Sequence, residues 1–338
     1  MSDTLPGAHE SGYRGSSLDE LGFPRGQTAL LVIDPVNDFL SEGGAAWELT
    51  KSTVKKNDVV GSLRRVIEGT RAHGVPVVYG PMAYTAEDYE QHELHRRSGI
   101  NRLMFEKKMF LAGTWGAEVH EELTPEPGDI ILQPHKGTDV FETDLPAQLD
   151  RLGITHLVIC GMTANLCCES TGRTAVERGY DVTYLSDAIG AESLPAYEAS
   201  IHLNYPLLSN AVMEVDEFLS ALERPEGANL PKEGDTVTGS DRGDLGTIDE
   251  VVVADGSSEE VGYMKVSRGV ILDKDTYIPL DAVVRRVGDE VFVNMPKLVV
   301  GKMPWSEKPT TSERREQLGP PAGTVDKLYR SAAPTGSA

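Results

Sequence analysis

The chain has 338 residues, of which 39% are hydrophobic and 25% are charged, a composition typical of a globular protein. Its length favours two domains. The formal net charge of -21 argues against nucleic acid and anionic membranes as partners, because both require clustered positive charge.

Residues 1–25 form a polar arm without the apolar core of a signal peptide, and no apolar run approaches the ~20 residues that cross a bilayer. Three cysteines, Cys160, Cys167 and Cys168, lie in one short stretch. That spacing is typical neither of a disulfide framework nor of a zinc ribbon. We therefore expect a cytoplasmic protein with free thiols.

Unbroken apolar runs alternate with amphipathic segments across residues 26–224, which we expect to form one domain. The runs predict strands covered on both faces, at 28–33, 75–79, 129–132, 156–160, 182–185 and 211–215. The amphipathic segments predict helices at 59–72, 144–152, 165–178 and 194–203. This alternation predicts an α/β fold, a doubly wound, mostly parallel six-stranded sheet flanked by helices. Residues 80–128 are expected to form an insertion over the carboxyl edge of the sheet.

The pattern changes after a linker at residues 225–234, which is rich in Pro, Gly and charge. Residues 235–302 contain short alternating segments separated by turn residues, which predict a small C-terminal β-barrel domain. Its strands are expected at 236–238, 246–253, 260–266, 270–272, 277–279, 283–287 and 290–293. Residues 303–338 have the composition of a loose tail.

Three reactive side chains stand near the carboxyl ends of predicted strands, where open α/β sheets bind ligands. Asp34 ends the first strand, Lys136 follows the third, and Cys167 lies in the first turn of the helix after the fourth. A helix N-terminus favours thiolate, a carboxylate can take the thiol proton, an ammonium can hold both anions, and free amide N–H groups can receive an oxyanion. Taken singly, these residues have ordinary interpretations as a turn, a solvated lysine and a small core residue. Their placement on one rim indicates an acyl-transfer site.

Three motifs carry a resemblance to a known family. The segment Gly161–Thr171 resembles the nucleophile motif of the isochorismatase-like cysteine hydrolases. Leu30–Asp34 with Asn37, Asp38 and Phe39 is similar to that family's opening motif, and His135-Lys136-Gly137 with Phe141 to its lysine motif. The motifs occur in the family's order and span about residues 26–222.

The resemblance implies that Asp34 is the proton acceptor, Lys136 the orienting cation and Cys167 the nucleophile. It also implies a cis peptide bond between Met162 and Thr163, and an oxyanion hole formed by the backbone N–H groups of Thr163 and Cys167. The family's habit implies a homo-oligomer.

Two absences narrow the implied chemistry. The family's nicotinamidases carry an Asp-x-His metal motif after the second strand, which this chain lacks at residues 79–84, and His92 and His95 have no evident carboxylate partner. We therefore expect neither a metal nor another cofactor. True isochorismatases generally lack the cysteine, so its presence favours an amide, carbamoyl or ureide bond in a small-molecule substrate. An ether or ester hydrolase on the same scaffold, and a non-catalytic binding or assembly protein acting through the barrel, remain as alternatives.

Aromatic residues are the expected substrate contacts. Phe39 lies beside the Asp34 motif, Tyr84 follows the second strand, and Trp115 lies between glycines in the insertion. The alternative for Trp115 is an ordinary core aromatic. The C-terminal segments 246–251 and 277–280 resemble a PRC-barrel-like domain, which we interpret as an assembly or partner-binding unit.

Overall fold

The computed structural model describes residues 22–91, 93, 98–223, 230–253, 262–267 and 275–308. The strand predicted at 270–272 and nearly all of the terminal arm and tail lie outside these residues. So do residues 225–229 of the predicted linker.

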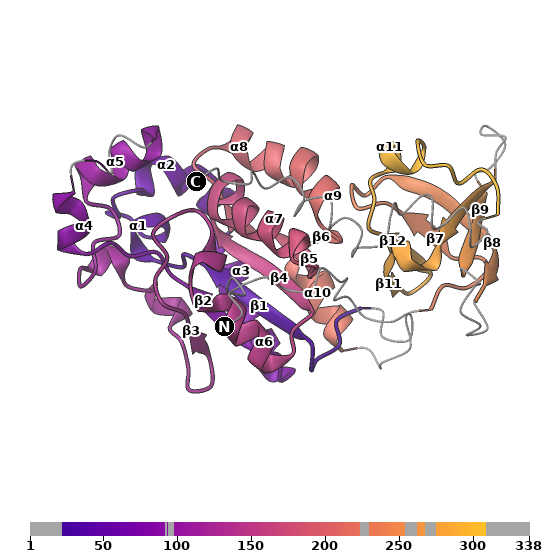
Figure 1. Ribbon diagram of the computed structural model, residues 1–338, viewed down its shortest axis with the longest axis horizontal. Helices are drawn as coiled ribbons and strands as arrows, with labels where there is room; N and C mark the ends of the chain where they lie inside the picture. The colour runs from indigo at the N-terminus through magenta and orange to yellow at the C-terminus, as the bar shows by residue number, and fades with distance from the viewer. Residues whose placement is uncertain are drawn as a thin grey trace, which may run out of the picture.

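A parallel six-stranded sheet forms the larger part of the molecule, with strand order β3-β2-β1-β4-β5-β6 (Figure 1). Its strands are β1 Thr28–Ile33, β2 Val77–Gly80, β3 Ile130–Ile131, β4 His156–Met162, β5 Asp181–Gly190 and β6 Ala211–Met213. All six residues of β1 and all seven of β4 are buried, as unbroken apolar strands in the middle of a parallel sheet should be. The predicted fold class is confirmed.

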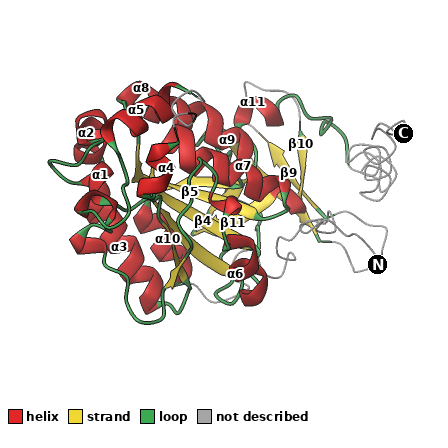
Figure 2. Cartoon of the chain, turned by 60° about the vertical axis from the view of Figure 1, so that its left-hand side comes forward, coloured by secondary structure: helices red, strands yellow, loops and turns green. Residues whose placement is uncertain are grey.

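Helices cover both faces of this sheet, as Figure 2 shows. The helix α3 packs against α10 on one face, while α6 and α7 lie on the other (Figure 1). The helices of this part are α1 Asn37–Leu40, α2 Trp47–Lys56, α3 Val59–Ala72, α4 Ala86–Glu90, α5 Gly99–Lys107, α6 Leu145–Leu152, α7 Glu169–Glu177, α8 Leu194–Ala199, α9 Tyr205–Leu208 and α10 Val215–Leu222. Short turns complete it: η3 Trp115–Ala117, η4 Glu121–Leu123, η5 Val140–Glu142 and the π-type turns η6 Ala164–Cys168 and η7 Ser200–Asn204.

The strand order creates a crevice between β1 and β4. These strands are neighbours, yet the chain leaves β1 toward β2 and leaves β4 toward β5, on the opposite side. Such a reversal opens a gap at the carboxyl edge of an α/β sheet, where ligands bind. The residues that follow β1 and β4 therefore lie at this crevice.

Gly161 lets these two strands approach each other at this crevice. Its φ of +112° disfavours any L side chain, and a Cβ here would overlap with the backbone carbonyl of Ile33 in β1. We expect Gly161→Ala to lower the free energy of unfolding by about 3 kcal/mol or more, through backbone strain and overpacking together. Urea denaturation measures this loss. Gly153→Ala is the matched control, because Gly153 also has a positive φ, +68°, but open space around its Cα. An equal loss in both variants would contradict the packing argument.

The C-terminal part contains a second, mixed six-stranded sheet with order β10-β9-β8-β7-β12-β11. Its elements are β7 Thr236–Thr238, β8 Asp244–Val252, β9 Tyr263–Ser267, β10 Thr276–Pro279, η8 Leu280–Ala282, β11 Val283–Val287, β12 Glu290–Val293 and α11 Lys297–Val300. This sheet fits a small barrel-like domain. Trp305, which the composition assigned to the tail, is buried in its core.

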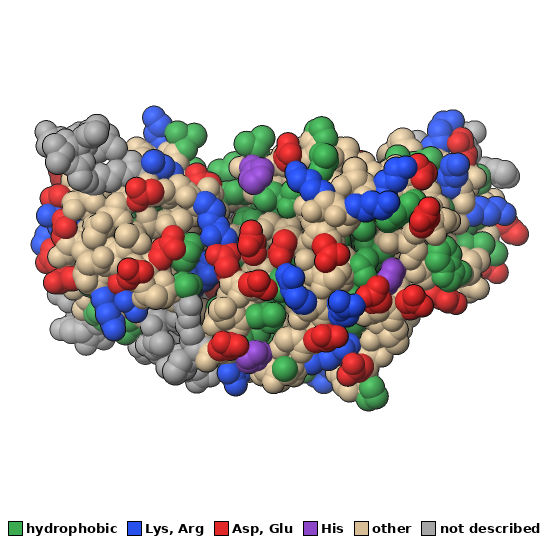
Figure 3. All heavy atoms as spheres, turned by 180° about the vertical axis from the view of Figure 1, so that it is seen from behind, with side chains coloured by type: hydrophobic (Ala, Val, Ile, Leu, Met, Phe, Trp, Pro, Cys, Tyr) green, Lys and Arg blue, Asp and Glu red, His purple; other side chains and the backbone are tan. Residues whose placement is uncertain are grey.

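Charges of both signs are interspersed over the surface, as the face in Figure 3 shows. No helix in the described part of the chain is long and apolar enough to cross a bilayer. Polar contacts join the two sheets' domains: the guanidinium of Arg242 pairs with Glu217, and the hydroxyl of Ser240 donates to the carbonyl of Pro206 at 2.6 Å.

Candidate active site

Asp34 stands at the end of β1 with no solvent exposure. Its backbone has a φ of +50°, and its N–H donates to the carbonyl of Gly80 at the end of β2, 3.0 Å away. This turn directs the carboxylate into the crevice. The oxygen Oδ2 is buried and has no hydrogen-bond partner among the described residues.

His135 contacts the other oxygen of this carboxylate. Its Nε2 lies 2.9 Å from Asp34 Oδ1, and its Nδ1 lies 2.7 Å from the carbonyl oxygen of Gly137. Both partners are acceptors, so the ring satisfies both contacts only when both nitrogens carry a proton. Burial disfavours the charged ring, but the charge and hydrogen bond of Asp34 outweigh it and raise the pKa of His135 above its usual value. These contacts and the raised pKa of His135 both favour the imidazolium form beside Asp34.

The predicted position of Lys136 is corrected by the structure. Its ammonium lies 2.6 Å from a carboxylate oxygen of Asp88 in α4, and its side chain is 51% exposed. The backbone explains this result. Residue 135 pairs with Met82 in a parallel bridge, and successive side chains of extended backbone point to opposite sides. His135 therefore faces the crevice and Lys136 faces away from Asp34.

Cys167 lies on the opposite side of the crevice, in the π-type turn η6 that follows β4. One ligand atom each from Asp34, His135 and Cys167 lie within 4.8 Å of one another. Burial and the charge of Asp34 raise the pKa of the Cys167 thiol well above its usual value, and the backbone N–H of Thr163 opposes that shift. Burial and the neighbouring carboxylate thus favour the thiol form of Cys167 over the thiolate.

The predicted cis peptide bond between Met162 and Thr163 is present. The other two thiols are placed elsewhere: Cys160 donates to the carbonyl of Leu31 between β4 and β1, and Cys168 is fully buried. Neither lines the cavity described next. The assignment of Thr163 and Cys167 N–H groups to an oxyanion hole remains a prediction.

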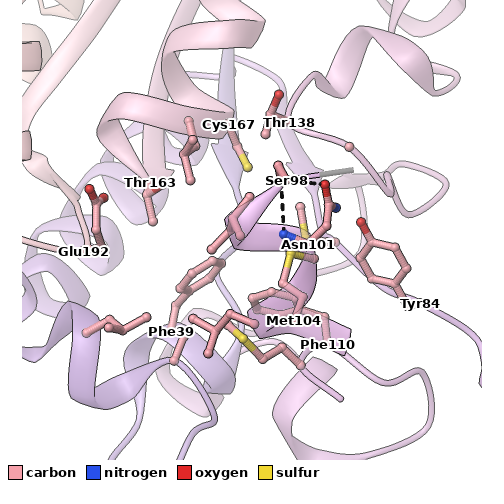
Figure 4. A pocket seen from close by; sticks show the side chains of 18 of the residues that line it. Phe39, Tyr84, Ser98, Asn101, Met104, Phe110, Thr138, Thr163, Cys167 and Glu192 are labelled. Carbon is pink, nitrogen blue, oxygen red and sulfur yellow. Dashed lines mark hydrogen bonds between the residues drawn. The ribbon is translucent and has the colours of Figure 1, made fainter. Parts of the chain in front are cut away.

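A cavity of about 580 Å³ opens above Cys167, whose sulfur points into it (Figure 4). Phe39 and Tyr84 line it, as predicted for substrate contacts, whereas Trp115 does not. Trp115 is 51% exposed, and Gly116 beside it packs against the carboxylate of Asp38. Residues 98–110 of the insertion supply one wall.

Asp38, in the helix α1 that follows Asp34, is hydrogen-bonded to that wall. Its carboxylate accepts hydrogen bonds from the backbone N–H of Phe110, at 2.6 Å, and of Ala45, at 2.8 Å. The opening motif therefore serves as a structural brace as well as carrying Asp34.

The sequence analysis missed several residues at this site. His135 belongs to the same motif as Lys136, and its imidazole, like the lysine ammonium, could be the cation beside Asp34. Glu192, two residues beyond β5, also lines the cavity, together with apolar residues of α5 such as Leu103 and Met104. No spacing rule marked these residues, because the fold brings them to the site from distant segments.

The donor set of Asp34, His135 and Cys167 is also one that zinc accepts in proteins. A zinc ion here would displace the hydrogen bond between His135 Nε2 and Asp34, since that nitrogen would become the ligand. We expect dialysis against a strong chelator to leave hydrolytic activity unchanged and elemental analysis to find no stoichiometric metal. A loss of activity restored by zinc would contradict this expectation.

Comparison with known proteins identifies the family of this chain. The family model described as the isochorismatase domain matches residues 28–216. The ureidoacrylate amidohydrolase RutB of Methylorubrum extorquens is 27% identical over 222 residues, which cover 63% of this chain and 90% of that protein. RutB of Pantoea ananatis is 30% identical over 50% of this chain and 72% of its own. A cysteine hydrolase structure from Pseudomonas syringae has the same fold, with a TM-score of 0.53 and 24% identity over 60% of this chain and 97% of that chain. The chain therefore belongs to the isochorismatase family of hydrolases.

Proposed function

We propose that this protein is a metal-independent cysteine amidohydrolase that cleaves the carbon–nitrogen bond of a small amide, carbamoyl or ureide compound. One observation carries the proposal: the thiol of Cys167, which lines a largely apolar cavity, lies next to the buried carboxylate of Asp34. The amidohydrolases among its relatives support the same bond class.

Acylation begins with transfer of the thiol proton to Asp34 as sulfur attacks the carbonyl carbon of the substrate. The oxyanion that forms accepts hydrogen bonds from the backbone N–H groups of Thr163 and Cys167. Asp34 then gives the proton to the nitrogen, the carbon–nitrogen bond breaks, and ammonia or an amine leaves. A thioester on Cys167 remains.

Deacylation uses the same groups in the reverse sense. Water attacks the thioester, Asp34 takes one proton from it, and sulfur leaves the carbonyl carbon and regains that proton. The imidazolium of His135 stays charged throughout, holds Asp34 Oδ1 in place and offsets the negative charge that moves between carboxylate and sulfur. His135 thus takes the part predicted for Lys136.

The test is to detect the reaction and its intermediate together. A panel of small primary amides and ureides is assayed for ammonia release, and turning-over enzyme is quenched in acid for mass spectrometry of the Cys167 peptide. We expect release from at least one compound and an acyl mass increment on Cys167. Ammonia release without an acyl mass increment on Cys167, measured with the substrate whose deacylation is slowest, would contradict the covalent route. Turnover of esters or enol ethers alone would favour the alternative hydrolase.

A further inference from the structure

Glu192 places a carboxylate on the wall of the cavity that Cys167 also lines. It follows β5, and its position is fixed by Thr53 of α2. The Thr53 hydroxyl lies 2.6 Å from the carbonyl oxygen of Ala191 and 2.9 Å from its N–H. In Figure 4, Thr163 lies between Glu192 and Cys167, and Tyr84 lies on the opposite side. Glu192 therefore lies at one end of the cavity, on the Thr163 side of Cys167.

The hydrogen-bonding capacity of this end is only partly used. Asn165 donates from Nδ2 to Glu192 Oε1 at 3.0 Å, which leaves Oε2 buried without a partner among the described residues. The side-chain oxygens of Asn165 and Thr163 are buried and unpartnered in the same sense. A buried acceptor without a donor costs about 1–3 kcal/mol. Glu192 and Thr163 both line the cavity, so unused acceptor capacity lies at this end of it, where a substrate N–H group could be bound.

The other residues that line the cavity also favour an N–H donor over a carboxylate next to Glu192. Most of its described lining is apolar, from residues such as Phe39, Leu103, Met104 and Phe110. Lys136 is the one cation among those lining residues, and its ammonium is already bound to Asp88. A substrate carboxylate would therefore meet the charge of Glu192 without a free counter-ion from the described lining.

We propose that Glu192 is a specificity-determining residue that binds a nitrogen donor of the substrate, an ammonium or a neutral ureido or amide N–H group, and rejects a carboxylate at that place. This rests on the proposed amidohydrolase function. It sets this chain apart from relatives named for ureidoacrylate, which is an anion. The substrate class is a small amide or ureide with an apolar body and an uncharged or cationic nitrogen group.

The experiment uses matched primary amides that end in a methyl, an ammonium or a carboxylate group, at two chain lengths. For the wild-type protein we expect kcat/KM to be highest for the ammonium-ended amides and at least 100-fold lower for the carboxylate-ended ones. In Glu192→Gln, the preference for ammonium over methyl should fall about 10-fold, mainly through KM, and kcat for the methyl-ended amides should change little. Glu48→Gln is the matched control, since Glu48 lies on α2 beside the cavity residue Leu49 but does not line the cavity itself.

A second measurement needs no variant: a short alkylammonium should inhibit the wild-type enzyme competitively and more strongly than the alkyl carboxylate of equal length. Preference for the carboxylate in either measurement would overturn the role of Glu192, as would unchanged selectivity in a folded Glu192→Gln protein. Failure to hydrolyse any amide would instead overturn the proposed function.

Discussion

Replacing Cys167 with alanine should lower kcat by on the order of 10⁴-fold or more, because loss of a nucleophile removes the whole covalent route. Substrate binding should persist, since Phe39, Tyr84 and the wall at residues 98–110 remain. Steady-state ammonia release measures the first effect. Equilibrium binding of an intact substrate to the inactive variant measures the second.

Cys168→Ala is the control for this prediction. Cys168 is fully buried and does not line the cavity, so the variant should keep most of its turnover while losing some stability. Iodoacetamide should correspondingly modify Cys167 first and inactivate the wild-type protein. Inactivation that tracks the labelling of Cys160 or Cys168 would disprove the assignment of the nucleophile.

Replacing His135 and Lys136 in turn should show which of the two side chains is the cation that acts on Asp34. His135→Ala leaves Asp34 without its hydrogen bond and counter-charge, and kcat/KM should fall by about 10²-fold or more. Lys136 lines the cavity but is bound to Asp88 and not to Asp34, so Lys136→Ala removes an ion pair away from the thiol, and its kcat/KM should stay within about 3-fold of wild type. A large loss in Lys136→Ala together with a small one in His135→Ala would restore Lys136 as the cation.

The pH dependence gives an independent measure of the same residue. The raised pKa of His135 means that its imidazolium, and the activity and stability that depend on it, are complete below about pH 6.5, the ordinary value in an unfolded chain. Both should decline as the pH rises through the folded pKa. His135→Lys should keep turnover and move this decline to higher pH, because lysine ordinarily titrates near 10.4. If activity and stability decline at the same pH in His135→Lys as in the wild type, the decline does not come from an imidazolium at position 135.

Elements with strong periodicity could be predicted from the sequence. The strand at Thr28–Ile33 and the helix at Val59–Ala72 have the predicted bounds, since an all-buried strand and a one-sided apolar helix leave clear patterns. The strand β5 extends well beyond the predicted residues 182–185. Its polar residues Ser186 and Asp187 interrupt the apolar run, and their partners, Met213 and Val215, come from β6 and α10. Such partners are visible only in the folded chain.

The site was predictable in part for a related reason. The positions of Asp34 and Cys167 follow from the ends of two central strands, which the hydrophobic pattern locates well. The choice between His135 and Lys136 depends on the direction of one side chain in an extended loop, and a shift of one residue reverses it. The place of Trp115 could not be predicted either. The sequence shows the glycines on both sides of it, but only the fold shows that Gly116 packs against Asp38 and that Trp115 is exposed.

The hydrogen bond from the Phe110 N–H to Asp38 bears on how a substrate gains access to the thiol. The backbone around Phe110 is also bound to Tyr84: the Tyr84 N–H donates to the Phe110 carbonyl, and the Ala112 N–H donates to the Tyr84 carbonyl, both at 2.8 Å. The end of the wall that follows α5 is thus held by hydrogen bonds to the segment that follows Asp34 and to the segment that follows β2. A substrate that reaches the thiol therefore passes a wall whose Phe110 end is fixed by these three hydrogen bonds.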